Sequence, residues 1–187
     1  MIDVTILEKA IIFAVNAHKG VTRKGDKRPY IMHPMSVMNR IYNAKKSDNM
    51  FLLAAAAILH DTVEDVTWVT HEVIYNEFGA AVAALVEELT LDKEKYKTIG
   101  KKEYLLQEMT KMSSYALAIK LCDRLDNVSD LKSLPAEKIS SYLDETEYIM
   151  NNLNRKLTGT HKKLIRQLWS EIKRVRKYLN KMTVETV

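Results

Sequence analysis

The sequence contains a single cysteine, Cys122, and few residues that interrupt regular structure. One cysteine excludes a disulfide bond within the chain and is typical of a reducing compartment, so we expect a cytoplasmic location. Three prolines, five glycines and no low-complexity segment exclude a fibrous or disordered chain of this length. The hydrophobic content of 47% is instead sufficient for a packed core.

Long hydrophobic runs are also missing. The longest covers about ten residues, Met50–Leu59, which is too short to cross a bilayer. The first residues include Asp3 and Glu8 and do not have the basic and then apolar pattern of a secretory signal. We therefore expect no association with a membrane.

Strand-like alternation of apolar and polar residues is absent, whereas helical periodicity recurs along the chain. The pattern predicts an all-α fold, a compact bundle of several helices. Residues 90–100 are polar and rich in lysine, so we expect a surface loop there. Trp68 and Trp169 lie on apolar stripes and are predicted to be in the core. His18, His71 and His161 lack partner patterns and are expected at the surface or as satisfied polar residues.

The net charge is +5, and the last predicted helix, residues 161–181, carries eight Lys or Arg against one Glu. Its apolar residues form a clean stripe, which favours a packed helix with a solvated basic face. Attraction of a small polyanionic molecule is the next interpretation. Binding to a nucleic acid duplex ranks third, because no recognised nucleic-acid motif accompanies the helix.

The densest group of ionisable residues follows the apolar run that ends at Leu59: His60, Asp61, Glu64 and Asp65. On a helix, residues four apart lie on one strip, so these side chains would converge on one face. Burying three carboxylates without compensation is prohibitively costly, and a divalent metal is the simplest compensation. His and Asp are common ligands of Mn, Fe or Zn. The plainer alternative is a helix cap beside a satisfied polar group.

Two other places combine ionisable residues with an apolar helix: His33, just before a proline, and residues 120–127 at the end of an apolar run. The following proline biases His33 away from helix, so residues 30–33 are predicted to be extended. His33, His60, Asp61 and Asp123 together would form a site of two nitrogens and two oxygens. This set suits Mn or Fe and tolerates Zn or Co.

The quoted residues are parts of a larger series of motifs. The series is Arg23-Lys24, Pro29-Tyr30-Ile31-Met32-His33-Pro34, Leu59-His60-Asp61-Thr62-Val63-Glu64-Asp65, Phe78-Gly79 and Leu121-Cys122-Asp123-Arg124-Leu125-Asp126-Asn127. In order and spacing it resembles the HD-superfamily hydrolase domain of RelA/SpoT proteins, which cleave the alarmones ppGpp and pppGpp. The compact length resembles the stand-alone small alarmone hydrolases, including the metazoan SpoT homologue, and residues 85–90 and 142–144 resemble that subgroup.

The resemblance implies a role for each matching position. His33, His60, Asp61 and Asp123 match four metal ligands, usually for Mn2+, with Fe, Co or Zn as alternatives. Glu64 and Asp65 match the catalytic pair that positions and activates the attacking water. Substrate contacts are implied for Arg23 and Lys24 at the base end, and for Asn127, Lys97, Lys138 and Tyr142. Lys138 stands where the small hydrolases often have Arg, which would lose bidentate phosphate geometry.

The resemblance also implies the organisation of the chain. We expect one HD hydrolase domain over residues 1–187, with a motif-bearing core at about 5–131 and helices at about 136–182 completing the bundle and its pocket. The metal site would lie between core helices. A homo-oligomer is left open.

The expected activity is metal-dependent hydrolysis of the 3′-pyrophosphate of (p)ppGpp, giving GDP or GTP and pyrophosphate. One alternative is an HD-type phosphatase that acts on NADPH or another phosphorylated nucleotide. A second is a nucleotide-binding module without catalysis. In each case the expected partner is a small nucleotide rather than a nucleic acid.

Overall fold

The computed structural model describes residues 4–184, and within this range the regular structure is helical. The only β pairing in the range is an isolated bridge between Thr22 and Pro29. The predicted all-α fold is therefore confirmed. The helices are α1 (Val4–Ala17), α2 (Met32–Ala44), α3 (Met50–Leu59), α4 (Thr62–Asp65), α5 (His71–Leu89), α6 (Lys93–Ile99), α7 (Lys101–Lys111), α8 (Ser114–Ser129), the 3-10 turn η1 (Leu131–Ser133), α9 (Ala136–Asn152) and α10 (Gly159–Val184). None of these helices is long and apolar enough to span a membrane.

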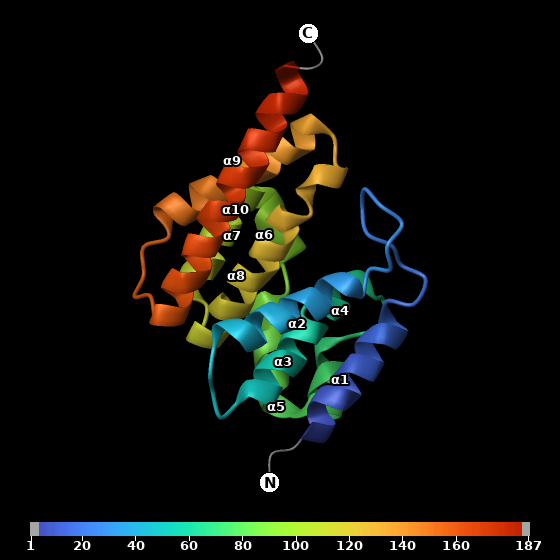
Figure 1. Cartoon of the computed structure of the whole chain (residues 1–187). Helices are drawn as coiled ribbons and strands as arrows, with labels where there is room; N and C mark the ends of the chain where they lie inside the picture. The colour runs from blue at the N-terminus through green and yellow to red at the C-terminus, as the bar shows by residue number, and fades with distance from the viewer. Residues whose placement is uncertain (1–3, 185–187) are drawn as a thin grey trace.

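Helix α3 lies at the centre of the N-terminal half, where it packs against α1, α2 and α5 (Figure 1). Its four alanines, residues 54–57, are fully buried. Short side chains allow neighbouring helices to approach closely. The main hydrophobic core forms around this helix and the first half of α8. Ionisable residues directly follow α3 and lie midway along α8, so the packing of the core brings them close together.

A second hydrophobic cluster joins the C-terminal half of α8 to α9 and α10. Its fully buried members include Val128, Ile139, Leu143, Leu168 and Val175. Helix α10 packs along α8 and reaches the end of the molecule opposite the N-terminus (Figure 1). The apolar stripe predicted for residues 161–181 is therefore buried against α8 and α9.

Two local predictions were wrong. Helix α2 begins at Met32, so His33 is helical rather than extended. The proline that follows it falls in the first turn, where a missing backbone N–H costs no helical hydrogen bond. Residues 90–100, predicted as a loop, contain helix α6. The Asp92 side chain caps this helix by accepting hydrogen bonds from the backbone N–H groups of Glu94 and Lys95.

Trp68 was predicted in the core but is 54% exposed. Its ring packs edge-on against Phe13, with centroids 5.3 Å apart, so only part of the indole is covered. Trp169 is half-buried at the margin of the second cluster.

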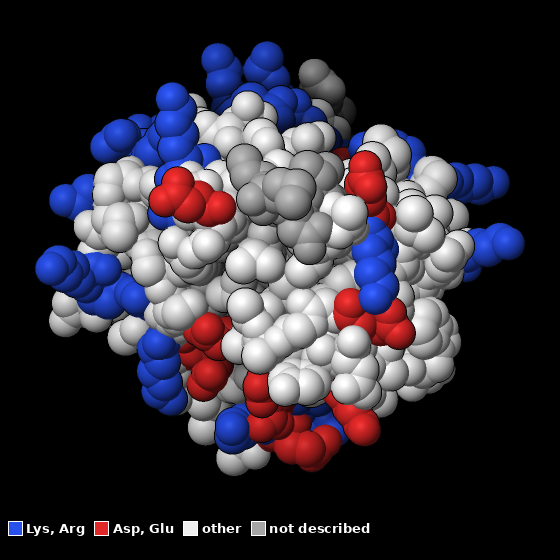
Figure 2. All heavy atoms as spheres, turned by 90° about the horizontal axis from the view of Figure 1, so that it is seen from below, with Lys and Arg blue, Asp and Glu red and all other residues white. Residues whose placement is uncertain are grey.

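Charged side chains are spread around the face seen from below, and both signs surround a broad uncharged area (Figure 2). The positive net charge of the chain does not form a continuous basic patch on this face. A nucleic-acid duplex would require such a patch, and the face drawn here does not offer one.

Gly25 fixes the loop between α1 and α2 against η1. It has φ +99°, and a Cβ there would lie 2.6 Å from Ser133 Oγ and 2.9 Å from the Ser133 carbonyl oxygen. Gly25→Ala is expected to lower the free energy of unfolding by about 2–5 kcal/mol. The left-handed backbone conformation of a non-glycine residue accounts for about 1–2 kcal/mol, and the overlap of the new Cβ with Ser133 accounts for about 1–3 kcal/mol. Urea unfolding measures the change.

Gly20→Ala is the matched control for this prediction. Gly20 has φ +81°, but a Cβ there meets nothing within 4 Å, so only the backbone contribution of about 1–2 kcal/mol applies. Equal losses in the two variants would contradict close packing of the loop on η1.

Candidate active site

Four side chains from three segments meet at the junction of the N-terminal core and α8. His33 comes from the first turn of α2, His60 and Asp61 from the turn between α3 and α4, and Asp123 from α8. His33 Nε2 lies 3.2 Å from Asp123 Oδ1, and His60 Nε2 lies 3.1 Å from Asp61 Oδ1. Donor atoms of His33, His60 and Asp123 all lie within 4.8 Å of one another. The structure thus brings together all four residues predicted as ligands.

Both imidazoles are held so that Nε2 faces this cluster. His60 Nδ1 donates a hydrogen bond to the Ala57 carbonyl oxygen at 2.8 Å, and His33 Nδ1 lies 2.8 Å from Asp126 Oδ2. With one proton on Nδ1, each imidazole can offer its Nε2 lone pair to a metal ion, which would displace any proton held there. His60 Nε2 is buried and has no hydrogen-bond partner. Two such nitrogens with two carboxylates fit a divalent transition-metal ion.

The electrostatic potential at the cluster is negative. Burial alone would lower the pKa of His60, but Asp61 and Asp123 outweigh it and raise the pKa to about 10. Burial would raise the pKa of Asp123, yet Lys120 and the two histidines hold it well below its usual value. The carboxylates therefore stay ionised in a poorly solvated place, where they attract a cation strongly.

Lys120 was not predicted as a site residue. It is only 7% exposed, and its Nζ lies 3.0 Å from Asp123 Oδ2. The charges of Asp123, Asp61 and Glu64 raise its pKa against the opposing effect of burial. Lys120 thus neutralises part of the carboxylate charge from inside the core. A lysine within an apolar run, three positions before a candidate ligand, was the available signal.

Asp126 was quoted in the sequence motif but received no role. Besides His33, its carboxylate contacts Ser36 and Arg40, with Arg40 Nε 3.1 Å from Oδ1. These contacts hold the pKa of Asp126 below its usual value despite burial. An ionised Asp126 fixes both the ring orientation and the tautomer of His33.

Asp126→Asn is expected to weaken divalent-metal affinity by about 10–100-fold, because an amide supports the His33 tautomer less well than a carboxylate does. Titration calorimetry with Mn2+ measures the change. Glu171→Gln serves as the control, since this carboxylate pairs with Arg174 on α10 outside the cluster. An unchanged affinity in Asp126→Asn would show that His33 does not need this partner.

The predicted catalytic pair lies on α4, next to the cluster. Glu64 is half-buried, and its Oε1 accepts a hydrogen bond from the Leu91 backbone N–H at 2.7 Å. Burial raises the pKa of Glu64 above its usual value although Lys120 opposes this. Asp65 lies at the exposed end of α4, and desolvation together with the charge of Asp61 raises its pKa. Both groups are thus stronger bases than carboxylates in water.

Tyr30 and His18 pack beside the predicted catalytic pair, and neither was predicted from the sequence as a site residue. Tyr30 Oη donates a hydrogen bond to Asp61 Oδ2 at 2.5 Å. The rings of Tyr30 and His18 pack against each other, with centroids 4.8 Å apart. His18 is 3% exposed, and neither ring nitrogen has a hydrogen-bond partner. It is therefore neither a surface residue nor a satisfied polar one, which corrects the prediction. Desolvation lowers its pKa, so the ring stays neutral against Tyr30.

Of the predicted substrate-binding residues, Asn127 contacts the histidine–aspartate cluster directly, and Arg23 contacts it through Asn127. Asn127 Nδ2 donates to Asp123 Oδ1 at 2.6 Å, and Arg23 Nη2 donates to Asn127 Oδ1 at 3.2 Å. Arg23 also pairs with Asp130 at 3.1 Å and lies over the Tyr30 ring. The guanidinium is thus held at a fixed place at the edge of the site.

The other predicted substrate-binding residues are less constrained. The Tyr142 ring is half-buried under the buried guanidinium of Arg124, 5.1 Å away. Lys97 is exposed on α6 and pairs with Glu94 at 2.8 Å. Lys24 and Lys138 are exposed, and neither makes an ion pair within residues 4–184. The structure does not bring these three lysines into the cluster.

Comparisons with known proteins agree with this geometry. A family model described as an HD domain matches residues 10–159. The chain is similar to the guanosine-3′,5′-bis(diphosphate) 3′-pyrophosphohydrolase MESH1 of Xenopus tropicalis, with 38% identity over 136 residues, covering 72% of this chain and 74% of that protein. It is 34% identical to the Homo sapiens protein of the same name over 170 residues, covering 86% and 93%.

A solved structure also resembles the chain as a whole. It is described as that of a metazoan ortholog of SpoT that hydrolyses ppGpp and plays a role in starvation responses. The TM-score is 0.76 at 28% sequence identity, covering 91% of this chain and 95% of the other. The likeness covers more of the chain than residues 10–159, which the family model matches.

Proposed function

The chain belongs to the HD-domain family, and from this premise we propose that it hydrolyses the 3′-pyrophosphate of ppGpp and pppGpp, giving GDP or GTP and pyrophosphate. The observation that carries the proposal is the meeting of His33, His60, Asp61 and Asp123 beside the half-buried carboxylate of Glu64. The similarity to MESH1 proteins and to the ppGpp-hydrolysing SpoT ortholog supports this choice of substrate.

His33, His60, Asp61 and Asp123 would hold one divalent cation, for which we propose Mn2+. Such a cation would lower the pKa of a water and neutralise charge on the phosphoryl oxygens. Imidazole and carboxylate ligands suit Mn2+, and Fe, Co or Zn would fit the same donor set.

Glu64 acts in the proposal as the general base. Its Oε1 is fixed by the Leu91 N–H, which leaves Oε2 to orient the attacking water and take its proton. The raised pKa of Glu64 strengthens it for this step. Asp65, on the same short helix, would orient the water from the exposed side. Lys120 lies behind Asp123 and stabilises the ionised carboxylates.

The substrate is a compact polyanion, and Arg23 is the side chain best placed to meet it. The Arg23 guanidinium is fixed by Asn127 and Asp130 at the edge of the site. A planar guanidinium can stack on a nucleotide base or bind a phosphate group. Tyr142 offers a ring beside Arg124. Lys24, Lys97 and Lys138 would steer the anion from the exposed surface rather than hold it.

The test is product analysis after the EDTA-stripped chain is incubated with ppGpp, with and without added Mn2+. We expect release of GDP and pyrophosphate only with the metal. NADPH and deoxynucleoside triphosphates are run in parallel, because an HD-type phosphatase would present the same cluster to them. Turnover of NADPH but not ppGpp would replace the proposed substrate. Metal binding without any turnover would favour a nucleotide-binding module.

We further propose that residues 1–187 act as one domain in the cytoplasm. Packing of α10 along α8 supports a single unit, because the helix that supplies Asp123 also carries the second hydrophobic cluster. Limited proteolysis that released residues 136–187 as a stable fragment would contradict this.

A further inference from the structure

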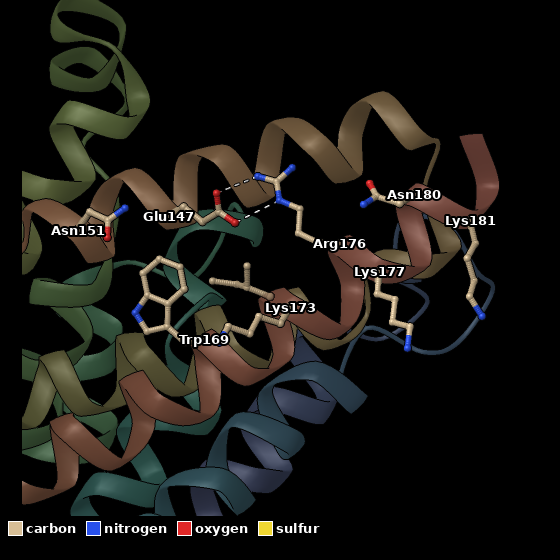
Figure 3. A pocket seen from close by; sticks show the side chains of 9 residues that line it. Glu147, Asn151, Trp169, Lys173, Arg176, Lys177, Asn180 and Lys181 are labelled. Atoms are coloured by element: carbon tan, nitrogen blue, oxygen red, sulfur yellow. Dashed lines mark hydrogen bonds and ion pairs between the residues drawn. The ribbon is translucent and has the colours of Figure 1, made fainter. Parts of the chain in front are cut away.

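A groove of about 980 Å3 lies between α9 and α10, away from the histidine–aspartate cluster (Figure 3). Helix α9 contributes Glu147 and Asn151, and α10 contributes one side of the groove from Trp169 to Lys181. The volume is within the range of small-molecule sites, about 300–1,000 Å3. None of the residues implied in hydrolysis lines this groove.

The middle of the groove is firmly built. Arg176 reaches from α10 to α9, where its Nε and Nη2 lie 3.1 and 3.0 Å from the two oxygens of Glu147 (Figure 3). The same guanidinium contacts Asp144 and Ser140. Because two carboxylates already neutralise Arg176, this residue shapes the groove rather than supplying charge for a ligand.

The remaining cations lie on one strip of α10. Trp169, Lys173, Lys177 and Lys181 are each four residues apart, so each is the neighbour of the next along α10, and the row turns about the helix axis by about 40° at each step. The three lysines cover about 12 Å of helix at 1.5 Å per residue. They are exposed, and among the described residues none of them makes an ion pair. A half-buried indole therefore stands at one end of an uncompensated row of ammonium groups.

We propose that this groove binds a nucleoside polyphosphate, with the base on the Trp169 ring and the phosphates along Lys173 and Lys177. The order on the helix, ring and then cations, matches the order of base and phosphates in the ligand. Every base has a face that stacks on an aromatic ring, and lysine is a common point-charge partner of phosphate. Asn151, opposite Trp169 on α9, offers an amide to the edge of the base. The site is independent of the proposed catalytic cluster.

The experiment uses the fluorescence of Trp169. Trp68→Phe in the full chain leaves Trp169 as the single tryptophan, and EDTA prevents metal-dependent hydrolysis during the titration. GTP and ATP are expected to quench the fluorescence saturably at about 0.15 M salt, where non-specific surface attraction is screened. Inorganic tripolyphosphate is expected to compete with GTP without quenching, and guanosine alone to bind only weakly.

Lys173→Ala/Lys177→Ala is expected to raise the half-saturating GTP concentration by at least about tenfold, since each charge-assisted contact contributes on the order of a tenfold change in affinity. Lys162→Ala/Arg166→Ala is the matched control. It removes the same charge from exposed positions of the same helix that do not line the groove, and its effect should stay below about twofold.

Three results would overturn the proposal. Absence of quenching at millimolar nucleotide would show that the groove does not bind this class. Equal weakening by the two double variants would show attraction by net charge alone. Full quenching that survives loss of Lys173 and Lys177 would place the ligand elsewhere. None of these results depends on whether ppGpp is a substrate.

Discussion

Asp123→Asn is expected to abolish tight metal binding and to lower kcat for ppGpp hydrolysis by at least about 10³-fold. A metal supplies several kcal/mol of transition-state stabilisation, and each 1.36 kcal/mol is a tenfold change in rate. Asp123 contacts His33, Lys120 and Asn127 and is one of the proposed ligands, so no neighbour can replace it. Metal content and steady-state hydrolysis at fixed Mn2+ are the measurements.

The same substitution leaves the Lys120 ammonium buried without its nearest carboxylate. Breaking one partner of a buried ion pair costs about 3–5 kcal/mol, so the variant will also be less stable. Lys120→Met/Asp123→Asn removes the stranded charge and should recover part of the stability. If hydrolysis returned together with stability in the double variant, the loss would have been one of folding, and Asp123 would not be a ligand.

Glu64→Gln is expected to lower kcat by about 10²–10⁴-fold while metal affinity stays unchanged, because it removes a general base and no proposed ligand. The amide can still accept the Leu91 hydrogen bond, so α4 should keep its position. Rapid-mix product assays give kcat, and calorimetry gives the metal affinity. Glu72→Gln, an exposed change on α5, serves as the control.

Asp65→Asn distinguishes the two carboxylates. Asp65 is the more exposed of the pair, so its loss should reduce kcat less than the loss of Glu64. A severe defect in Asp65→Asn beside a mild one in Glu64→Gln would reverse their roles.

The parts of the site predicted from sequence are those in which charge directly follows a buried apolar helix. His60 and Asp61 follow α3, and Asp123 interrupts α8, so each was conspicuous in its local context. Lys120 and Asp126 were missed because a lone charge on a helix resembles a solvated side chain. Only the packing of α8 against α2 and α3 turns both residues inward, and that packing involves contacts far apart in sequence.

Local structure was mispredicted at two places, residues 90–100 and Trp68. Helix α6 lacks an apolar period, and its start depends on the Asp92 cap, which a search for periodicity does not detect. Trp68 carries an aromatic ring of core type, but it packs on Phe13 at the edge of the fold. The start of α6 thus follows from the residue directly before it, whereas the place of Trp68 depends on Phe13, which is distant in the sequence.

The chain of contacts from Arg23 through Asn127 to Asp123 has a thermodynamic consequence. The Asn127 carbonyl oxygen accepts from Arg23 and its amide NH2 donates to Asp123, so one side chain joins the edge of the site to a proposed metal ligand. In the proposed site, a nucleotide that engaged Arg23 would alter this shared contact and with it the hold of Asp123 on a cation. Linkage then requires reciprocity: whatever factor the nucleotide applies to the metal's dissociation constant, the metal applies to that of the nucleotide.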